Sequence, residues 1–126
     1  MSTGVLVGHS MGGGIISQVA EDLPDKVKVL VFLRAELPLN GESVLQGLQA
    51  DAKSLAFPNF VVSDDKISGT FRAEVPREGF HRDCSDADVT LARALLVQLP
   101  LAPHETSVQM GTANFGRVSR IYIECL

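Results

Sequence analysis

The residues best suited to chemistry lie near the start of the sequence, in the run Gly8-His9-Ser10-Met11-Gly12. The run matches G-x-S-x-G, a pattern in which a serine occupies a sharp turn between a strand and a helix. Glycines have no Cβ, so the strand and the helix can approach closely around such a turn. The unpaired N–H groups at the start of the helix also point toward the serine. We therefore expect Ser10 to be a nucleophile and the N–H of Met11 to stabilise an oxyanion.

Two other interpretations of this turn stay open. The chain has 11 glycines in 126 residues, so the bare pattern is weak evidence, and an ordinary glycine-rich turn would also produce it. Three consecutive glycines at 12–14 could instead cradle a phosphate at the start of a helix. The Lys-Ser/Thr pair and the G-x-G-x-x-G spacing of such loops are missing, which makes phosphate binding the weaker interpretation.

The residues around the motif predict the elements that the turn needs. Residues 5–7 are apolar and indicate a buried strand, and apolar residues at helical spacing from Met11 indicate a helix that ends at Pro24. Residues 27–33 are rich in β-branched side chains, which is typical of a parallel strand covered on both faces. Strand, helix and strand form a βαβ unit, so the predicted fold class is α/β, with parallel strands and covering helices.

The pattern loosens after this unit. We expect a turn at 38–41, a short helix within 42–51, strands at 60–62 and 70–75, a helix that Ser85 caps and that continues to about Leu99, and a last strand at 120–124. So long an insertion between two sheet strands usually covers a pocket. The predicted organisation is one domain: a βαβ core in residues 1–37, a cap or lid insertion in 38–105 and a return to the sheet in 106–126.

Composition excludes several other classes of protein. Hydrophobic residues make up 45% of the chain, so it can bury a core and wholesale disorder is not expected. Eleven basic residues against 15 acidic ones give a net charge of −4, so we expect no nucleic-acid partner. No apolar run reaches 18 residues and the start is unlike a signal peptide, so no membrane contact is expected. Cys84 and Cys125 lack CxxC spacing, which favours a reducing, cytoplasmic location.

Several of these segments together resemble a known family, the α/β-hydrolase superfamily. The likeness rests on VLVGHSMGG at 5–13 and LVFLRA at 30–35 with Pro38, and it is closest to the esterase branch that includes plant methylesterases and hydroxynitrile lyases. FHRDCS at 80–85, with the helix after it, looks like the cap of that branch, and RVSRIYIEC at 117–125 looks like the strand before the catalytic acid. The resemblance implies a partial α/β-hydrolase fold, a chain truncated at both ends, and a serine carboxylesterase for small esters with no cofactor or metal.

The resemblance leaves the general base open. The order in the family is Ser, Asp, His, which puts the acid and the histidine beyond residue 126. A serine without a base is a weak nucleophile, so we expect His81, in the cap segment, to stand in as the base. We expect His9 to line the substrate pocket, although it could also serve as the base. Cys84 is expected to be a buried thiol, with a Cys84–His81 dyad as a further alternative. Four apolar cap residues would suit a small acyl or alcohol group: Leu48, Phe60, Phe71 and Phe80.

Three functions remain open at this point. The first is the serine carboxylesterase, with a small-molecule ester as substrate. The second is a catalytically inactive, truncated hydrolase that binds small apolar ligands or associates with itself, and the third is a hydroxynitrile lyase on the same framework. An open edge at the strand of residues 5–7 favours a homo-oligomer formed through exposed sheet edges.

Overall fold

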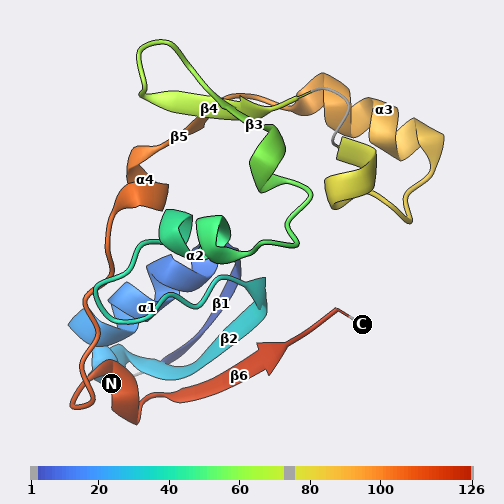
Figure 1. The fold of residues 1–126 in the computed structure, drawn as a ribbon. Coiled ribbons are helices and arrows are strands. Elements are labelled where there is room, and N and C mark those ends of the chain that lie inside the picture. The colour runs from blue at the N-terminus through green and yellow to red at the C-terminus, as the bar shows by residue number, and fades with distance from the viewer. Residues whose placement is uncertain (1–2, 73–75, 126) are drawn as a thin grey trace. The chain divides into compact units, whose positions relative to one another are not determined.

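The computed structural model describes residues 3–72 and 76–125. They fall into two compact units, which are described separately (Figure 1). We call Met1–Gly47 with His104–Leu126 the sheet unit and Leu48–Pro103 the hairpin unit. The boundaries of the hairpin unit fall after Gly47 and after Pro103, and the insertion predicted from the sequence covers residues 38–105.

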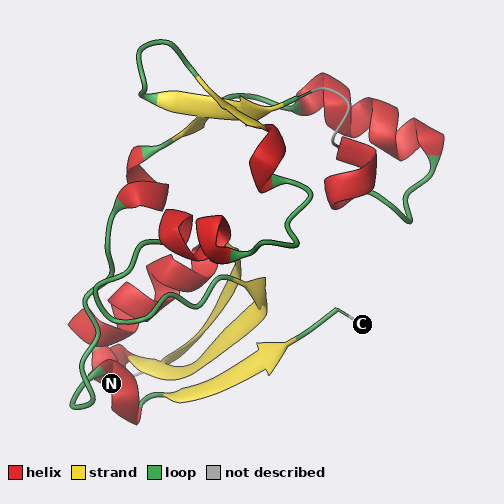
Figure 2. Ribbon diagram, in the orientation of Figure 1, coloured by secondary structure: helices red, strands yellow, loops and turns green. Residues whose placement is uncertain are grey.

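The sheet unit contains the predicted βαβ arrangement. Strand β1 (Gly4–Ser10), helix α1 (Gly12–Asp22) and strand β2 (Val27–Ala35) follow one another, and β1 and β2 are parallel (Figure 2). Strand β6 (Ser119–Ile123) returns to the same sheet and pairs in parallel with β2, which gives the strand order β1-β2-β6. The α/β fold class with parallel strands is therefore confirmed, as is the last strand.

One face of this sheet carries the core. Helix α1 packs on it through Ile16 and Ala20, against the fully buried side chains of Leu30 and Phe32. The Ser17 hydroxyl, also buried, donates to the Gly13 carbonyl at 2.8 Å, so no polar atom is left unpaired there. The helical stripe predicted from the sequence is thus rotated. The helical spacing in the sequence predicts a stripe of five apolar residues: Ile15, Ile16, Val19, Ala20 and Leu23. Of these, Ile15 and Leu23 are 50% and 54% exposed.

The other sheet face is open in the described part of the chain. Val5, Val7, Leu33, Ile121 and Ile123 are all exposed there, although parallel sheets are normally covered on both faces. The prediction that residues 27–33 form a doubly covered strand is therefore wrong for the described residues. Among the described residues, strands β1 and β6 are the two edges of the sheet, so the expected open edge at residues 5–7 is present there.

Short elements connect the sheet strands. The predicted turn at 38–41 contains Gly41 at a φ of 84°, a left-handed conformation that glycine adopts without strain. Ser43 then begins a capping box, since its N–H donates to Gln46 Oε1 at 2.7 Å and its hydroxyl accepts from the Gln46 N–H at 3.3 Å. The remaining elements are η1 (Pro24–Lys26), α2 (Val44–Ala50), α4 (Ala102–Glu105) and η4 (Phe115–Arg117).

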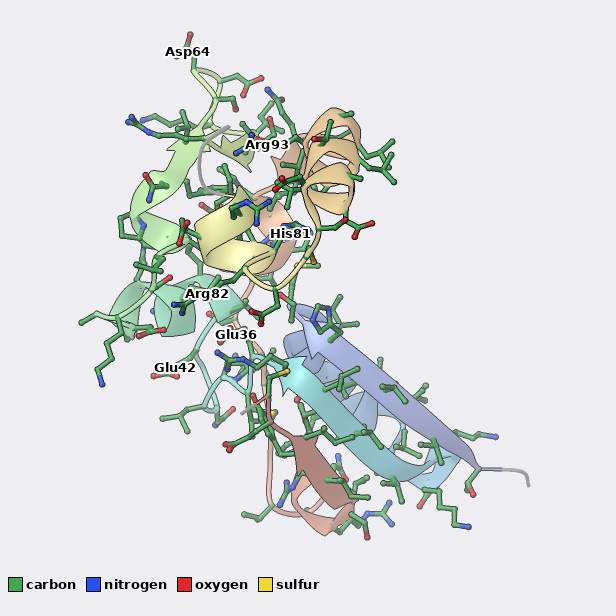
Figure 3. All side chains as sticks on the ribbon, turned by 90° about the vertical axis from the view of Figure 1, so that its right-hand side faces the viewer. Glu36, Glu42, Asp64, His81, Arg82 and Arg93 are labelled. Carbon is green, nitrogen blue, oxygen red and sulfur yellow. The ribbon has the colours of Figure 1, made fainter. Side chains whose placement is uncertain are left out.

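The hairpin unit is built on a small antiparallel sheet. Its strands are β3 (Phe60–Val62), β4 (Ser68–Phe71) and β5 (Leu99–Pro100), in that order. The polar turn between β3 and β4 points Asp64 away from the strands (Figure 3). The predicted strand at 70–75 starts at Ser68, and its last three residues lie outside the described part of the chain. Around the sheet lie η2 (Phe57–Asn59), η3 (Pro76–Phe80) and α3 (Asp86–Leu95).

Helix α3 begins where the sequence predicts and ends about four residues before its predicted end. The Ser85 hydroxyl accepts from the Asp88 N–H at 3.2 Å, so Ser85 is the N-cap. The helix stops at Leu95 rather than near Leu99, because Leu99 turns extended and pairs with Gly69 of β4. A residue before proline is also biased toward the extended conformation, which favours this early end.

None of the helices in residues 3–72 and 76–125 has the length and apolar character needed to cross a membrane. The same residues contain no group of three or more His, Cys, Asp or Glu side chains placed to hold a metal ion.

Candidate active site at the turn between β1 and α1

Ser10 occupies the predicted sharp turn. It is the last residue of β1, Met11 is the N-cap of α1, and the φ of Ser10 is 53°. A residue with a Cβ pays about 1–2 kcal/mol for this left-handed conformation. Such strain persists only where the surrounding structure fixes it, and it is common at functional sites. The serine is exposed, so its hydroxyl is accessible at the carboxyl end of the strand.

The glycines around Ser10 differ in the space that a Cβ would have at each position. A Cβ on Gly8 would stand 2.6 Å from the Gly12 carbonyl oxygen, and one on Gly13 would stand 1.9 Å from the Glu36 carbonyl oxygen. A Cβ on Gly12 would meet no atom within 4 Å. The expectation that Gly8 permits a close approach is confirmed. The same expectation for Gly12 is wrong, because the close contact, with the Glu36 carbonyl directly after β2, falls on Gly13.

Backbone contacts from β2 hold the turn. Ser10 pairs with Ala35, and its carbonyl accepts from the Glu36 N–H at 2.9 Å. The Tyr122 hydroxyl of β6 in turn donates to the Ala35 carbonyl at 2.8 Å. Glu36 follows directly on the end of β2 (Figure 3). All three strands of the sheet therefore contribute to the backbone geometry of Ser10.

The start of α1 leaves an amide available beside the serine. Among the described residues, no acceptor takes the N–H of Met11, while its carbonyl accepts from the Gly14 N–H at 3.1 Å. The N-terminal end of a helix also carries partial positive charge. Together these features give the turn what is needed to stabilise a negative charge that develops next to Ser10.

The other predicted site residues lie in both units. His9 precedes Ser10 on β1 and is exposed. His81 belongs to the hairpin unit, where its N–H donates to the Arg77 carbonyl at 3.1 Å and its ring lies 6.4 Å from that of Phe80. Cys84 is exposed, so the prediction of a buried thiol is wrong. It lies in the turn between η3 and α3, which contributes little apolar cover.

The structure does bring three of the four predicted cap residues together. The rings of Phe60 and Phe71 lie 5.0 Å apart and those of Phe71 and Phe80 lie 4.8 Å apart, both edge to face. Aromatic rings prefer this geometry. Leu48 is half-buried at the start of the hairpin unit.

Glu21 has a role that the sequence did not suggest. Its carboxylate accepts from the N–H groups of Gly111 and Phe115 at 2.7 and 3.0 Å and from the Asn114 side chain at 3.3 Å. These bonds, above all those from the two backbone N–H groups, lower the pKa of Glu21 from its ordinary value. Glu21 therefore ties the end of α1 to the loop that leads into β6.

A pocket of about 500 Å³ lies in the sheet unit, away from this chemistry. Residues 37–40, 110–112 and 115–116 line it together with Arg120. Arg120 stacks over the Phe115 ring, with its guanidinium carbon 4.5 Å from the ring centre. None of the predicted site residues lines this pocket, so it adds nothing to the candidate active site.

Comparison with known proteins places this turn in a family. Residues 2–87 match the family model described as the alpha/beta hydrolase fold. The chain belongs to this family. The predicted fold class and resemblance are thereby confirmed, because the strand, the sharp turn and the helix all lie within the matched residues.

Curated relatives agree with the esterase branch. The chain is 30% identical to the putative methylesterase 11, chloroplastic, of Arabidopsis thaliana, over 97% of this chain and 33% of the relative. It is 29% identical to the probable esterase PIR7A of Oryza sativa subsp. indica, over 94% of this chain and 50% of the relative. The chain thus spans a third to a half of the length of these relatives.

A solved structure gives the same picture of the fold. The pyrethroid hydrolase from Sphingobium faniae JZ-2 superposes with a TM-score of 0.78 at 26% identity. The match covers 98% of this chain and 51% of that hydrolase.

Proposed function

We propose that this chain carries the nucleophile of a serine carboxylesterase-type hydrolase that acts on small esters. The observation that carries the proposal is the left-handed backbone of Ser10, φ 53°, between a parallel strand and a helix. Relatives named as methylesterases and esterases support an ester as the substrate class. The exposed position of Ser10 and the available N–H of Met11 support nucleophilic attack with oxyanion stabilisation.

In the proposed reaction, the Ser10 Oγ attacks the ester carbonyl carbon and gives its proton to a general base. The carbonyl oxygen becomes an oxyanion next to the Met11 N–H. The oxyanion collapses, the bond to the alkoxy group breaks, and the leaving alcohol takes the proton from the base. Water then attacks the acyl-serine, its proton passes through the same base, and the carboxylic acid leaves with Ser10 restored. One ester and one water give one alcohol and one acid.

We propose a histidine as the general base, because imidazole can take and return the proton of the serine near neutral pH. His81 remains our candidate within the chain, and His9 remains the candidate for the pocket wall beside Ser10. His81 belongs to the hairpin unit and Ser10 to the sheet unit.

The first experiment compares hydrolysis of p-nitrophenyl acetate and butyrate by the wild type and by Ser10→Ala. Ser119→Ala, which changes an exposed serine of β6, is the matched control. We expect turnover by the wild type and the control and a loss of at least about 100-fold in Ser10→Ala, as for the removal of other catalytic groups. Equal, slow rates in all three proteins would refute Ser10 as the nucleophile.

One observation favours a second candidate, a catalytically inactive hydrolase that binds small apolar ligands. Within the sheet unit, the Ser10 hydroxyl takes part in no hydrogen bond among the described residues, and a serine without a base is a weak nucleophile. The same assay separates the two candidates. A single burst of p-nitrophenol equal to the protein concentration, with no turnover after it, identifies a serine that is acylated and not deacylated.

A further inference from the structure

The end of β2 departs from regular strand geometry next to Ser10. His9 pairs with Leu33 and Ser10 pairs with Ala35, so Arg34 is an extra residue without a partner on β1. This is a β-bulge, which parallel strands rarely contain. The φ of Arg34 is 43°, a left-handed conformation that is uncommon for a residue with a long side chain.

The bulge decides which side chain reaches the surface. Side chains of a strand alternate between the two faces, and Leu30 and Phe32 point into the core under α1. Strict alternation would send Arg34 into the core after them. The bulge instead places Ala35 there, 5% exposed, and leaves Arg34 exposed at the carboxyl end of β2. A buried and unpaired guanidinium is thereby avoided, and Arg34 lies at the end of the strand that pairs with β1 at Ser10.

The guanidinium of Arg34 is not neutralised by a partner in the described part of the chain. Arg34 takes part in no ion pair and no side-chain hydrogen bond among the described residues. The nearest acidic side chain along the chain, Glu36, is directed toward α2, since one of its carboxylate oxygens lies 3.7 Å from where a Cβ of Gly47 would stand. The start of α1, on the other side of Ser10, also carries partial positive charge.

We infer that Arg34 gives the site a preference for esters that carry a carboxylate near the scissile bond. This inference rests on the proposed function, because it takes Ser10 as the reacting residue. The whole chain has a net charge of −4, which repels anions in general, so a local cation at the site has a strong effect on which anions approach. A guanidinium binds a carboxylate through two parallel N–H···O bonds, which also orients the ester.

The test uses two esters of the same shape, 4-acetoxybenzoate and 4-acetoxybenzamide, which differ in charge. The measured quantity is kcat/KM for 4-acetoxybenzoate divided by kcat/KM for 4-acetoxybenzamide, each corrected for hydrolysis in buffer. We expect this ratio to fall about fivefold in Arg34→Gln and to stay near the wild-type value in Arg34→Lys, which keeps the charge. The wild-type ratio should also fall in 1 M salt, where the Debye length is only about 3 Å and the charge of Arg34 is strongly screened.

Lys28→Gln is the matched control, because Lys28 is an exposed cation at the other end of β2. If Lys28→Gln lowers the ratio as much as Arg34→Gln does, net charge explains the preference and the inference is wrong. An unchanged ratio in Arg34→Gln also overturns it. Circular dichroism at the assay temperature confirms that each variant is folded.

If the wild type hydrolyses neither ester, the proposed function fails and a binding measurement decides about Arg34 separately. The probes are then 4-acetamidobenzoate and 4-acetamidobenzamide, titrated by NMR. Tighter binding of the benzoate by about fivefold, lost in Arg34→Gln, supports the inference. Equal binding of the two probes by the wild type overturns it.

Discussion

The strain at Ser10 predicts an unusual effect of glycine on stability. Ser10→Ala and Ser10→Gly both remove the hydroxyl, and only glycine relieves the left-handed conformation at φ 53°. The relief is worth about 1–2 kcal/mol. Glycine also gives the unfolded chain more freedom, which costs about 0.5–1 kcal/mol. We therefore expect the glycine variant to be more stable than the alanine variant by roughly 0.5–1 kcal/mol.

The assay is thermal unfolding followed by circular dichroism, together with urea denaturation. For a chain of this length the expected difference corresponds to about 2–4 °C in Tm. Ser119→Ala and Ser119→Gly are the controls, because Ser119 lies in β6 and is not among the residues with positive φ. At Ser119 glycine should be the less stable variant, by about 0.5–1 kcal/mol. The same order at both positions, with glycine below alanine, would refute the strain at Ser10.

Three further predictions follow from the sheet unit. Gly8→Ala should lose about 1–3 kcal/mol in urea denaturation because its Cβ would meet the Gly12 carbonyl, whereas Gly12→Ala should be tolerated; equal losses would contradict this difference. The lowered pKa of Glu21 means that its bonds stabilise the fold above the pKa of the unfolded chain and lose this effect as pH falls through the folded pKa, so Glu21→Gln should flatten the fall of stability in acid. We also propose that the chain self-associates through the open edge at β1, which size-exclusion chromatography with light scattering tests; a monomer throughout the micromolar range would contradict it.

The local parts of the fold were predictable from the sequence. The βαβ unit follows from an apolar run, a helical stripe that ends at Pro24 and a β-branched run, and each of these signals lies within one element. The Ser85 cap is equally local, since a serine followed by acidic residues provides the acceptor and suits the helix dipole. Such signals need no knowledge of distant residues.

The predictions that were wrong, or that the sequence did not allow, concern contacts between distant residues. The apolar residues after Leu95 continue a helical spacing, and the pairing of Leu99 with Gly69 of β4 ends the helix instead. Three consecutive glycines give no sign that Gly13, rather than Gly12, meets Glu36. The bulge at Arg34 is a matter of register between β1 and β2, which the composition of neither strand reveals.

The same reasoning explains why a G-x-S-x-G match alone is weak evidence. The left-handed Ser10 is fixed by the Glu36 N–H and by pairing with Ala35, whose carbonyl is held by Tyr122, more than 110 residues along the chain from Ser10. The partners in these contacts, Ala35, Glu36 and Tyr122, all lie outside the five residues of the motif. The motif permits the turn, because Gly8 leaves room for it, and the assembled sheet imposes it. A serine in this pattern is strained, and so set apart from an ordinary turn, only where the neighbouring strands are in place.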